Sequence, residues 1–210
     1  MKQVEGIWLP DHEQHLVEWK ERADGKLAYQ TYKLAEALKY TRNFRAAIDI
    51  GAHCGLWSLN LVKLFDRVHA FEPVEEHREC YKKNVIAENF ILNPVALCEK
   101  NGFCSIFTSW GSSGDSWVNG DGEIPVHTLD MYDVRDVDFI KLDCEGYEYF
   151  ALKGGEDTLK KWKPCVIVEQ KPNRAQKFGL KETQAVTYLE SLGAKLRYVM
   201  TGDYILSWDE

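Results

Sequence analysis

Acidic side chains follow two apolar segments in the second half of the chain. In VDFIKLDCEGYE an apolar run is followed at alternate positions by Lys141, Asp143 and Glu145, and the segment CVIVEQ carries Glu169 near its end. Charge in the middle of a buried strand is costly unless it is paired, whereas charge at the carboxyl end of a strand can open into a cleft. We therefore expect Lys141 to be an internal counter-charge and Asp143 to face a functional cleft.

Carboxylates in such a cleft can act as general bases or bind a cation. Asp143 is the first candidate for a base, and Glu145 and Glu169 are the second candidates. A helix cap or a pair with Lys141 is the structural alternative for Asp143, and a position in the first turn of a helix is the alternative for Glu145. These oxygen ligands could also hold Mg²⁺. No spacing requires the ion, so no metal ligand is predicted.

A glycine pattern and a later acidic residue indicate a nucleoside site. The segment AIDIGAHCGLWS contains D-x-G-x-x-x-G, with Asp49, Gly51 and Gly55, and the segment RVHAFEP carries Glu72 about 20 residues after the first glycine. Glycine permits a positive φ and a close approach of a ligand to the backbone. An acid at the Glu72 position can accept hydrogen bonds from a ribose diol. An ordinary strand-to-helix turn is the alternative for the glycines alone.

The position of Asp49 bears on which nucleoside is bound. An acid at the end of the first strand would repel a pyrophosphate but suits a cationic amino or sulfonium group. This favours S-adenosylmethionine over NAD. An NAD-type oxidoreductase remains an alternative, disfavoured by the glycine spacing and the lack of a Tyr-x-x-x-Lys pair. A non-catalytic nucleotide-binding or interaction module is the other alternative.

The elements that must position these residues alternate between short apolar strands and helical patterns. From Ala46 onward this alternation predicts right-handed βαβ units, a parallel sheet with helices on both faces, and ligands at the carboxyl ends of the strands. The final segment, AKLRYVMTGDYILSW, predicts an antiparallel hairpin around TGD. The expected strands are AAIDIG, RVHAFEP, FILNPVAL, DFIKLD and CVIVEQ, and the expected helices are LWSLNLVKLF, EEHRECYKKNVIA, EYFALKGGEDTLKKW and ETQAVTYLESLG.

Two other regions differ from this alternation. Residues 10–22 and 29–40 carry helical patterns separated by the turn ADGK, so residues 1–45 are expected to form a helical extension packed on the core. Residues 108–123 are rich in turn residues but contain Trp110 and Trp117, which fits either a substrate lid or a mobile loop. With 210 residues, the chain predicts a single globular unit.

Composition excludes several classes of partner. The net charge of −7 argues against long nucleic acid and anionic membranes as partners. The six cysteines form no C-x-x-C pair and are expected to be buried thiols in a reducing compartment. No signal peptide or membrane span is recognisable. We therefore expect a cytoplasmic protein, and the sequence leaves its oligomeric state open.

Several of these segments together resemble the FkbM family of S-adenosylmethionine-dependent methyltransferases, over residues 46–170. The segments are AIDIGAHCGLWS, AFEPVEEHRECYKKNV, NPVALCEKNG, the GSSGDS region, VHTLDMY and VDFIKLDCEGYEYFALKGGEDTLKKWKPCVIVE. The resemblance implies an α/β, three-layer Rossmann-like class I fold over residues 46–210, with a mostly parallel seven-stranded sheet and a C-terminal antiparallel hairpin.

The resemblance also implies an activity and a binding site. The activity is methyl transfer, typically to a hydroxyl oxygen of a sugar, polyketide or similar small molecule. The cofactor loop would consist of Asp49, Gly51, Ala52, His53 and Gly55, and the ribose site of Glu72 and Pro73. The family commonly has asparagine where His53 stands. A divalent metal stays an unpredicted alternative, and the acceptor is not identified.

Overall fold

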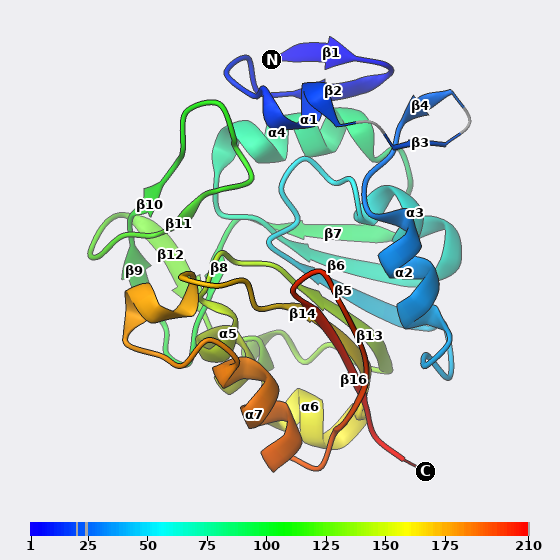
Figure 1. The fold of residues 1–210 in the computed structure, drawn as a ribbon, viewed down its shortest axis with the longest axis vertical. Coiled ribbons are helices and arrows are strands. Elements are labelled where there is room, and N and C mark those ends of the chain that lie inside the picture. The colour runs from blue at the N-terminus through cyan, green and yellow to red at the C-terminus, as the bar shows by residue number, and fades with distance from the viewer. Residues whose placement is uncertain (20, 24, 210) are drawn as a thin grey trace.

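The computed structural model describes residues 1–19, 21–23 and 25–209, and a seven-stranded sheet forms its centre (Figure 1). The strand order is β15-β16-β14-β13-β5-β6-β7. The five strands of this sheet that come first in the sequence are parallel to one another. The two that come last form the expected antiparallel hairpin. The parallel strands are β5 (Ala46–Ile50), β6 (Arg67–Phe71), β7 (Phe90–Asn93), β13 (Val137–Leu142) and β14 (Cys165–Glu169); the hairpin is β15 (Lys195–Met200) and β16 (Asp203–Ser207). The structure confirms the predicted fold class.

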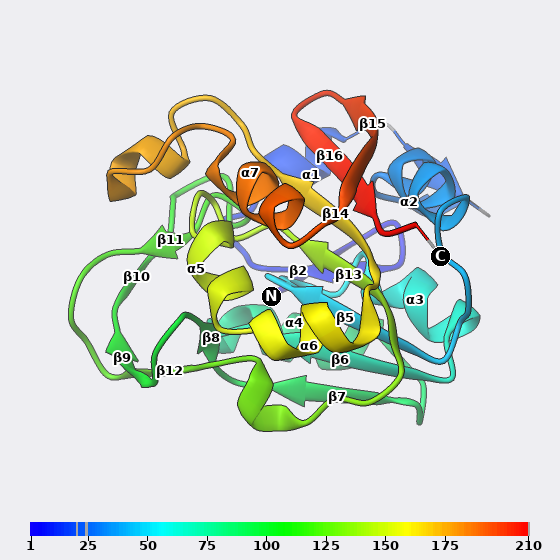
Figure 2. The same cartoon turned by 90° about the horizontal axis from the view of Figure 1, so that it is seen from below.

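Helices cover both faces of this sheet because its central strands are apolar on both sides. Every residue of β5, β13 and β14 is buried, as expected for parallel strands between two helical layers. Ala47 and Phe139 face α2 (Thr31–Leu38) and α3 (Ser58–Leu64), and α4 (Glu75–Asn84) packs on the same side through Tyr81. Ile48 and Ile140 face the opposite layer, which lies in front of the sheet in Figure 2. That layer contains α5 (Glu148–Lys153), α6 (Glu156–Trp162) and α7 (Gln184–Ser191).

Short strands lie beyond the carboxyl ends of the parallel strands (Figure 1). They form a three-stranded sheet and a small hairpin, and two 3₁₀ helices accompany them. These elements are β8 (Ala96–Leu97), β9 (Gly102–Cys104), β12 (Ile124–His127), β10 (Ile106–Phe107), β11 (Trp117–Val118), η1 (Asp130–Tyr132) and η2 (Ala175–Phe178). In the described part of the chain, no helix combines the length and the apolar character that crossing a membrane requires.

The N-terminal region contains less helix than the sequence predicted. The helix expected over residues 10–22 is reduced to α1 (His15–Glu18). Backbone N–H groups of Gln14 and His15 bond the carbonyl of Gly111, 2.9 and 3.1 Å away, so a distant loop provides the partner for the start of this segment. Two unpredicted hairpins accompany it: β1 (Lys2–Val4) with β2 (Ile7–Leu9), and β3 (Arg22–Ala23) with β4 (Lys26–Leu27). Asp24 of the predicted ADGK turn lies outside the described residues.

The helix expected over residues 148–162 is divided into α5 and α6 at Gly154 and Gly155. A Cβ on Gly154 would come within 1.9 Å of the carbonyl oxygen of Cys98, so only glycine permits this close approach. The carboxylate of Asp130 accepts hydrogen bonds from the N–H groups of Asp157 and Thr158 at 3.0 and 2.9 Å. The second helix therefore starts against a side chain from another part of the chain.

Candidate functional site

Two cavities open at the carboxyl ends of the parallel strands. With the space that opens to solvent included, the first occupies about 600 Å³ and the second about 930 Å³. Phe71, Val95, Leu97, Ile106 and Val118 give the first cavity an apolar lining. Four residues line both cavities and therefore mark their junction, namely Gly51, His53, Gly114 and Asp143.

The turn after β5 requires glycine. Gly51 has φ +72°, and a Cβ there would lie 1.9 Å from the carbonyl oxygen of Asp143. Gly55 has φ +83°, and a Cβ there would lie 2.7 Å from Val85 and 2.8 Å from the ring of Tyr81. At both positions the positive φ and the lack of room for a Cβ exclude residues other than glycine. The turn therefore packs directly against the backbone that follows β13, where the two cavities share their lining.

Asp49, predicted to belong to the cofactor loop, is completely buried within β5. Its carboxylate accepts a hydrogen bond from Ser58 Oγ at 2.7 Å and lies 3.3 Å from Lys141 Nζ. It lines neither cavity. Lys141 also donates to the carbonyl of Gly51 at 2.7 Å. Although burial opposes the shift, the carboxylates of Asp49 and Asp143 raise the pKa of Lys141. The pair of Asp49 and Lys141 therefore supports the turn from inside the sheet.

Glu72 and Pro73 line the first cavity, where the ribose site was expected. The carboxylate of Glu72 accepts hydrogen bonds from the N–H groups of His53 at 2.8 Å and Val74 at 2.9 Å, and His77 Nδ1 lies 3.2 Å away. Burial alone would raise the pKa of Glu72, but His77 and the two backbone donors lower it. Glu72 is therefore an ionised acceptor held in a fixed orientation. His77, which the sequence reasoning missed, lies five residues after Glu72 on α4.

His53 lies between the cofactor loop and a loop from the middle of the chain. Its φ is +51°, and its Nε2 lies 2.7 Å from Ser113 Oγ. The ring meets the edge of His77 with 4.4 Å between the ring centroids. Burial, with smaller contributions from His77 and Lys141, lowers the pKa of His53. A neutral imidazole therefore stands at the junction of the two cavities.

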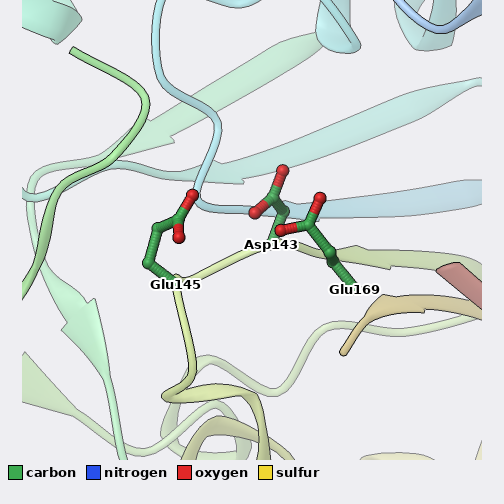
Figure 3. Close-up of side chains that lie close together, drawn as sticks. All are labelled: Asp143, Glu145 and Glu169. Atoms are coloured by element: carbon green, nitrogen blue, oxygen red, sulfur yellow. The ribbon is translucent and has the colours of Figure 1, made fainter. Parts of the chain in front are cut away.

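The three predicted catalytic carboxylates converge, as Figure 3 shows. Asp143, Glu145 and Glu169 each contribute an oxygen to a group whose members lie within 4.8 Å of one another. Asp143 and Glu145 follow β13, and Glu169 ends the neighbouring strand β14. Glu145 has φ +57°, which an L-residue adopts only when its surroundings impose it. We call these three residues the acidic cluster.

Two cations compensate the acidic cluster. Lys171 Nζ lies 2.6 Å from the carboxylate of Glu169, and Arg174 Nε lies 3.0 Å from that of Glu145. Burial, followed by the charge of Asp143, nevertheless raises the pKa of Glu145 to about 8 and that of Glu169 to about 9. Burial and the charge of Asp143 therefore act against the two ion pairs, and Glu145 and Glu169 hold protons more tightly than exposed glutamates do.

The sequence that forms these site elements also matches a known protein family. The model of a family described as Methyltransferase FkbM domain matches residues 49–196. The chain belongs to this family. The match begins at Asp49 and includes the glycine turn, Glu72 and the acidic cluster. FkbM membership removes the NAD-type oxidoreductase as an alternative.

Solved structures show the same methyltransferase fold. The chain is similar to the methyltransferase FkbM from Methylobacillus flagellatus KT, with 18% identity and a TM-score of 0.52, over 83% of this chain and 50% of that chain. It is similar to an rRNA methylase from Streptococcus thermophilus, with 12% identity and a TM-score of 0.53, over 86% of this chain and 96% of that one. A protein from Streptococcus mutans in complex with SAH matches with 9% identity and a TM-score of 0.53, over 85% of this chain and 97% of that one.

The extent of these matches differs. The chain spans half the length of the FkbM methyltransferase from Methylobacillus flagellatus. A comparison of the sequence with curated proteins found no match. The solved structures therefore show the fold, and the family match shows membership among FkbM methyltransferase domains.

The site fits the S-adenosylmethionine that an FkbM fold implies. The apolar lining of the first cavity suits an adenine ring. Glu72 Oε1 faces both Val74 N–H and His77, whereas Oε2 accepts one bond from the protein, so an acceptor position on Oε2 is left for a ribose hydroxyl. Gly51 contributes only backbone atoms to the lining that the two cavities share. The donor and acceptor set agrees with a nucleoside in the first cavity.

Several residues of the second cavity were missed from sequence. Tyr29 and Glu13 come from the region before the FkbM match, where no motif singled them out. Burial and the carboxylates of Asp143 and Glu169 raise the pKa of Tyr29, so its phenol stays protonated. Lys171 and Arg174 follow β14 within five residues, and their position after a strand end was a usable signal. We call Tyr29, with Glu13, His15 and Leu16, the N-terminal wall of the second cavity.

Proposed function

We propose that the protein binds S-adenosylmethionine at this junction and transfers its methyl group to a hydroxyl oxygen of a small molecule or sugar, with Asp143 as the general base. One observation carries the assignment of the base: of the carboxylates that line the cavities in the described chain, Asp143 lines both. When bound, S-adenosylmethionine supplies a methyl group made electrophilic by its sulfonium.

The residues of the cavities divide the work. A hydroxyl is a weak nucleophile until it loses its proton, so a base near it accelerates the reaction. Asp143 is half-buried at the end of β13 and can accept that proton. Glu145 and Glu169 hold protons more tightly than exposed glutamates and already face Arg174 and Lys171, so they are less available as bases. Glu72 and Pro73 would hold the ribose. The amino-acid part of the cofactor would lie against the Gly51 turn, which lines both cavities.

The second cavity supports a compact, hydroxylated acceptor. Tyr29, Trp57 and Leu16 provide aromatic and apolar surface, whereas Lys171 and Arg174 bring charged groups. A sugar or similar ring has apolar C–H faces and hydroxyl edges, which this combination of surfaces can contact.

Ligand binding provides the first test. We expect S-adenosylmethionine and S-adenosylhomocysteine to raise the melting temperature and NAD to leave it unchanged. Stabilisation by NAD alone, or by none of the three, would contradict the proposal. Turnover is then measured as release of S-adenosylhomocysteine with a panel of sugars and hydroxylated metabolites. Cofactor binding without turnover on any acceptor would favour the non-catalytic module.

The role of Asp143 can be tested separately with sinefungin, which carries an amine where S-adenosylmethionine carries its methyl-sulfonium. The charge of Asp143 should make sinefungin bind about tenfold more tightly than S-adenosylhomocysteine, because a charge-assisted hydrogen bond is worth about 1.5 kcal/mol or more. Asp143→Asn should lose that preference, keep its affinity for S-adenosylhomocysteine, and lower turnover by roughly 10²-fold or more. Asp121→Asn, which changes an exposed aspartate that lines neither cavity, is the matched control and should keep both the sinefungin preference and the turnover. Full turnover of Asp143→Asn would exclude Asp143 as the base.

A further inference from the structure

A buried chain of hydrogen bonds connects the N-terminal wall to the cofactor loop. The backbone N–H of Ser113 donates to Glu13 Oε2 at 2.7 Å, its hydroxyl contacts the same oxygen, and its Oγ lies 2.7 Å from His53 Nε2. Glu13 is 1% exposed and Ser113 is fully buried. Glu13 lies before the FkbM match over residues 49–196. A residue outside the family domain therefore reaches a loop that lines both cavities.

The chemistry of the three groups gives this chain a direction. Glu13 is surrounded by donors, because its other oxygen accepts the N–H of Leu16 at 2.8 Å. A carboxylate that faces donors accepts hydrogen bonds, so the hydroxyl hydrogen of Ser113 points to Glu13. The Ser113 oxygen is then left as an acceptor toward His53. Nε2 of His53, which also lies 3.6 Å from Cys54 Sγ, therefore carries the hydrogen that faces the Ser113 oxygen at 2.7 Å, and Nδ1 carries the lone pair.

We propose that Glu13, acting through Ser113, fixes the Nε2–H tautomer of His53 and is thereby a positioning residue of the cofactor site. His53 lines both cavities, and its Nδ1 has no hydrogen-bond partner among the described residues. That nitrogen is available to accept a hydrogen bond from an amino or hydroxyl group of the bound cofactor. A neutral ring with this tautomer offers an acceptor at the junction and adds no positive charge beside a sulfonium.

The same contacts hold the loop in place. Gly111 lies two residues before Ser113 in the chain. Its carbonyl accepts hydrogen bonds from the N–H groups of Gln14 and His15. Gly114, the neighbour of Ser113, lines both cavities. The N-terminal wall therefore sets both the position of the loop and the hydrogen-bonding character of His53.

The tautomer can be measured directly by two-bond ¹H–¹⁵N correlation spectra of protein labelled in its histidine rings. The His53 signals are identified by their loss in His53→Asn. We expect the Nε2–H form in the native chain and a mixture of tautomers in Glu13→Gln and Ser113→Ala. Glu18→Gln, an exposed change on the same segment, should leave the spectrum unchanged. An Nδ1–H or charged His53 in the native chain, or unchanged spectra in both variants, would overturn the proposal. If Glu13→Gln does not fold, Ser113→Ala decides.

A second measurement concerns the cofactor and rests on the proposed function. By calorimetry, Glu13→Gln and Ser113→Ala should each weaken S-adenosylhomocysteine binding by roughly fivefold to tenfold, the loss of about one hydrogen bond. The double variant should be no weaker than either single variant, because both break one chain. Native affinity in both variants, or additive losses, would overturn the positioning role. Failure of the native chain to bind would instead count against the proposed function, and the spectra would still test the tautomer.

Discussion

Lys141 Nζ lies 3.3 Å from Asp49 Oδ1, and the two residues are direct partners on the adjacent strands β13 and β5. Both are buried in the centre of the sheet. Lys141 also bonds the carbonyl of Gly51, so the pair is connected to the turn at the junction of the cavities. The lysine in the apolar run of β13 is therefore explained by a carboxylate almost a hundred residues earlier in the chain.

Removing this lysine should destabilise the fold. Lys141→Met would leave Asp49 buried without its counter-charge, which costs about 3–5 kcal/mol of unfolding free energy. Urea denaturation followed by circular dichroism measures this loss. The double variant Lys141→Met with Asp49→Asn should recover part of it, and Lys63→Met on the exposed side of α3 should change stability by less than about 0.5 kcal/mol. A single variant as stable as the native chain would show that the pair contributes nothing.

The Gly51 turn should not tolerate a side chain. In Gly51→Ala the new Cβ would meet the carbonyl of Asp143 at 1.9 Å with φ at +72°, so overpacking and backbone strain together should cost roughly 2 kcal/mol or more. Binding of S-adenosylhomocysteine should be lost with it. Gly102→Ala, with no atom within 4 Å of its Cβ, is the matched control. Equal melting temperatures and equal affinities for the two variants would refute this account of the turn.

Stability should depend on pH through Glu169. Burial and the charge of Asp143 raise its pKa from the ordinary 4.5 to about 9, so the folded chain holds a proton that the unfolded chain releases. Between these values the folded state binds more protons, and stability falls as pH rises. Glu169→Gln cannot ionise, so its stability relative to the native chain should improve across this interval, by on the order of 1 kcal/mol per pH unit at most. Urea midpoints at a series of pH values measure the trend.

The matched control for this series is Glu123→Gln, which changes an exposed glutamate. Its pH profile should follow that of the native chain. A Glu169→Gln variant that loses stability relative to the native chain as pH rises would reverse the sign and show that the ion pair with Lys171 outweighs burial.

Divalent metal should not be required for activity. The ion pairs of Lys171 with Glu169 and of Arg174 with Glu145 already provide cations to the acidic cluster. Chelation with EDTA should therefore leave the melting temperature and turnover unchanged, as should addition of Mg²⁺, Mn²⁺ or Ca²⁺. A saturable rise in melting temperature with Mg²⁺ that disappears in Glu145→Gln would show that the cluster is a metal site.

Local patterns in the sequence were sufficient to predict the sheet. The strands around Ile48, Ile140 and Val166 are short, mostly apolar segments separated by helical segments, and this alternation permits few topologies. The same patterns failed for residues 10–22, because the N–H groups of Gln14 and His15 bond a loop nearly a hundred residues away. The helical spacing of apolar residues carries no information about a hydrogen-bond partner so far away in the sequence.

The candidate site divides in the same way. Asp143, Glu145 and Glu169 could be selected from sequence because each follows the end of an apolar strand, and strand ends meet at one edge of a parallel sheet. Tyr29 and Glu13 could not, because their place in the second cavity depends on how the N-terminal region packs across the cleft.

The sequence alone determined the family, the order of the strands along the chain and the residue types at their ends. Only the tertiary structure decided what each charge does. Asp49 was expected to face the cofactor but lies inside the sheet against Lys141, whereas Asp143 opens into both cavities. The role of each carboxylate depends on contacts between residues far apart in the chain. Burial and pairing, and not residue type, decide whether a carboxylate supports the fold or faces a ligand.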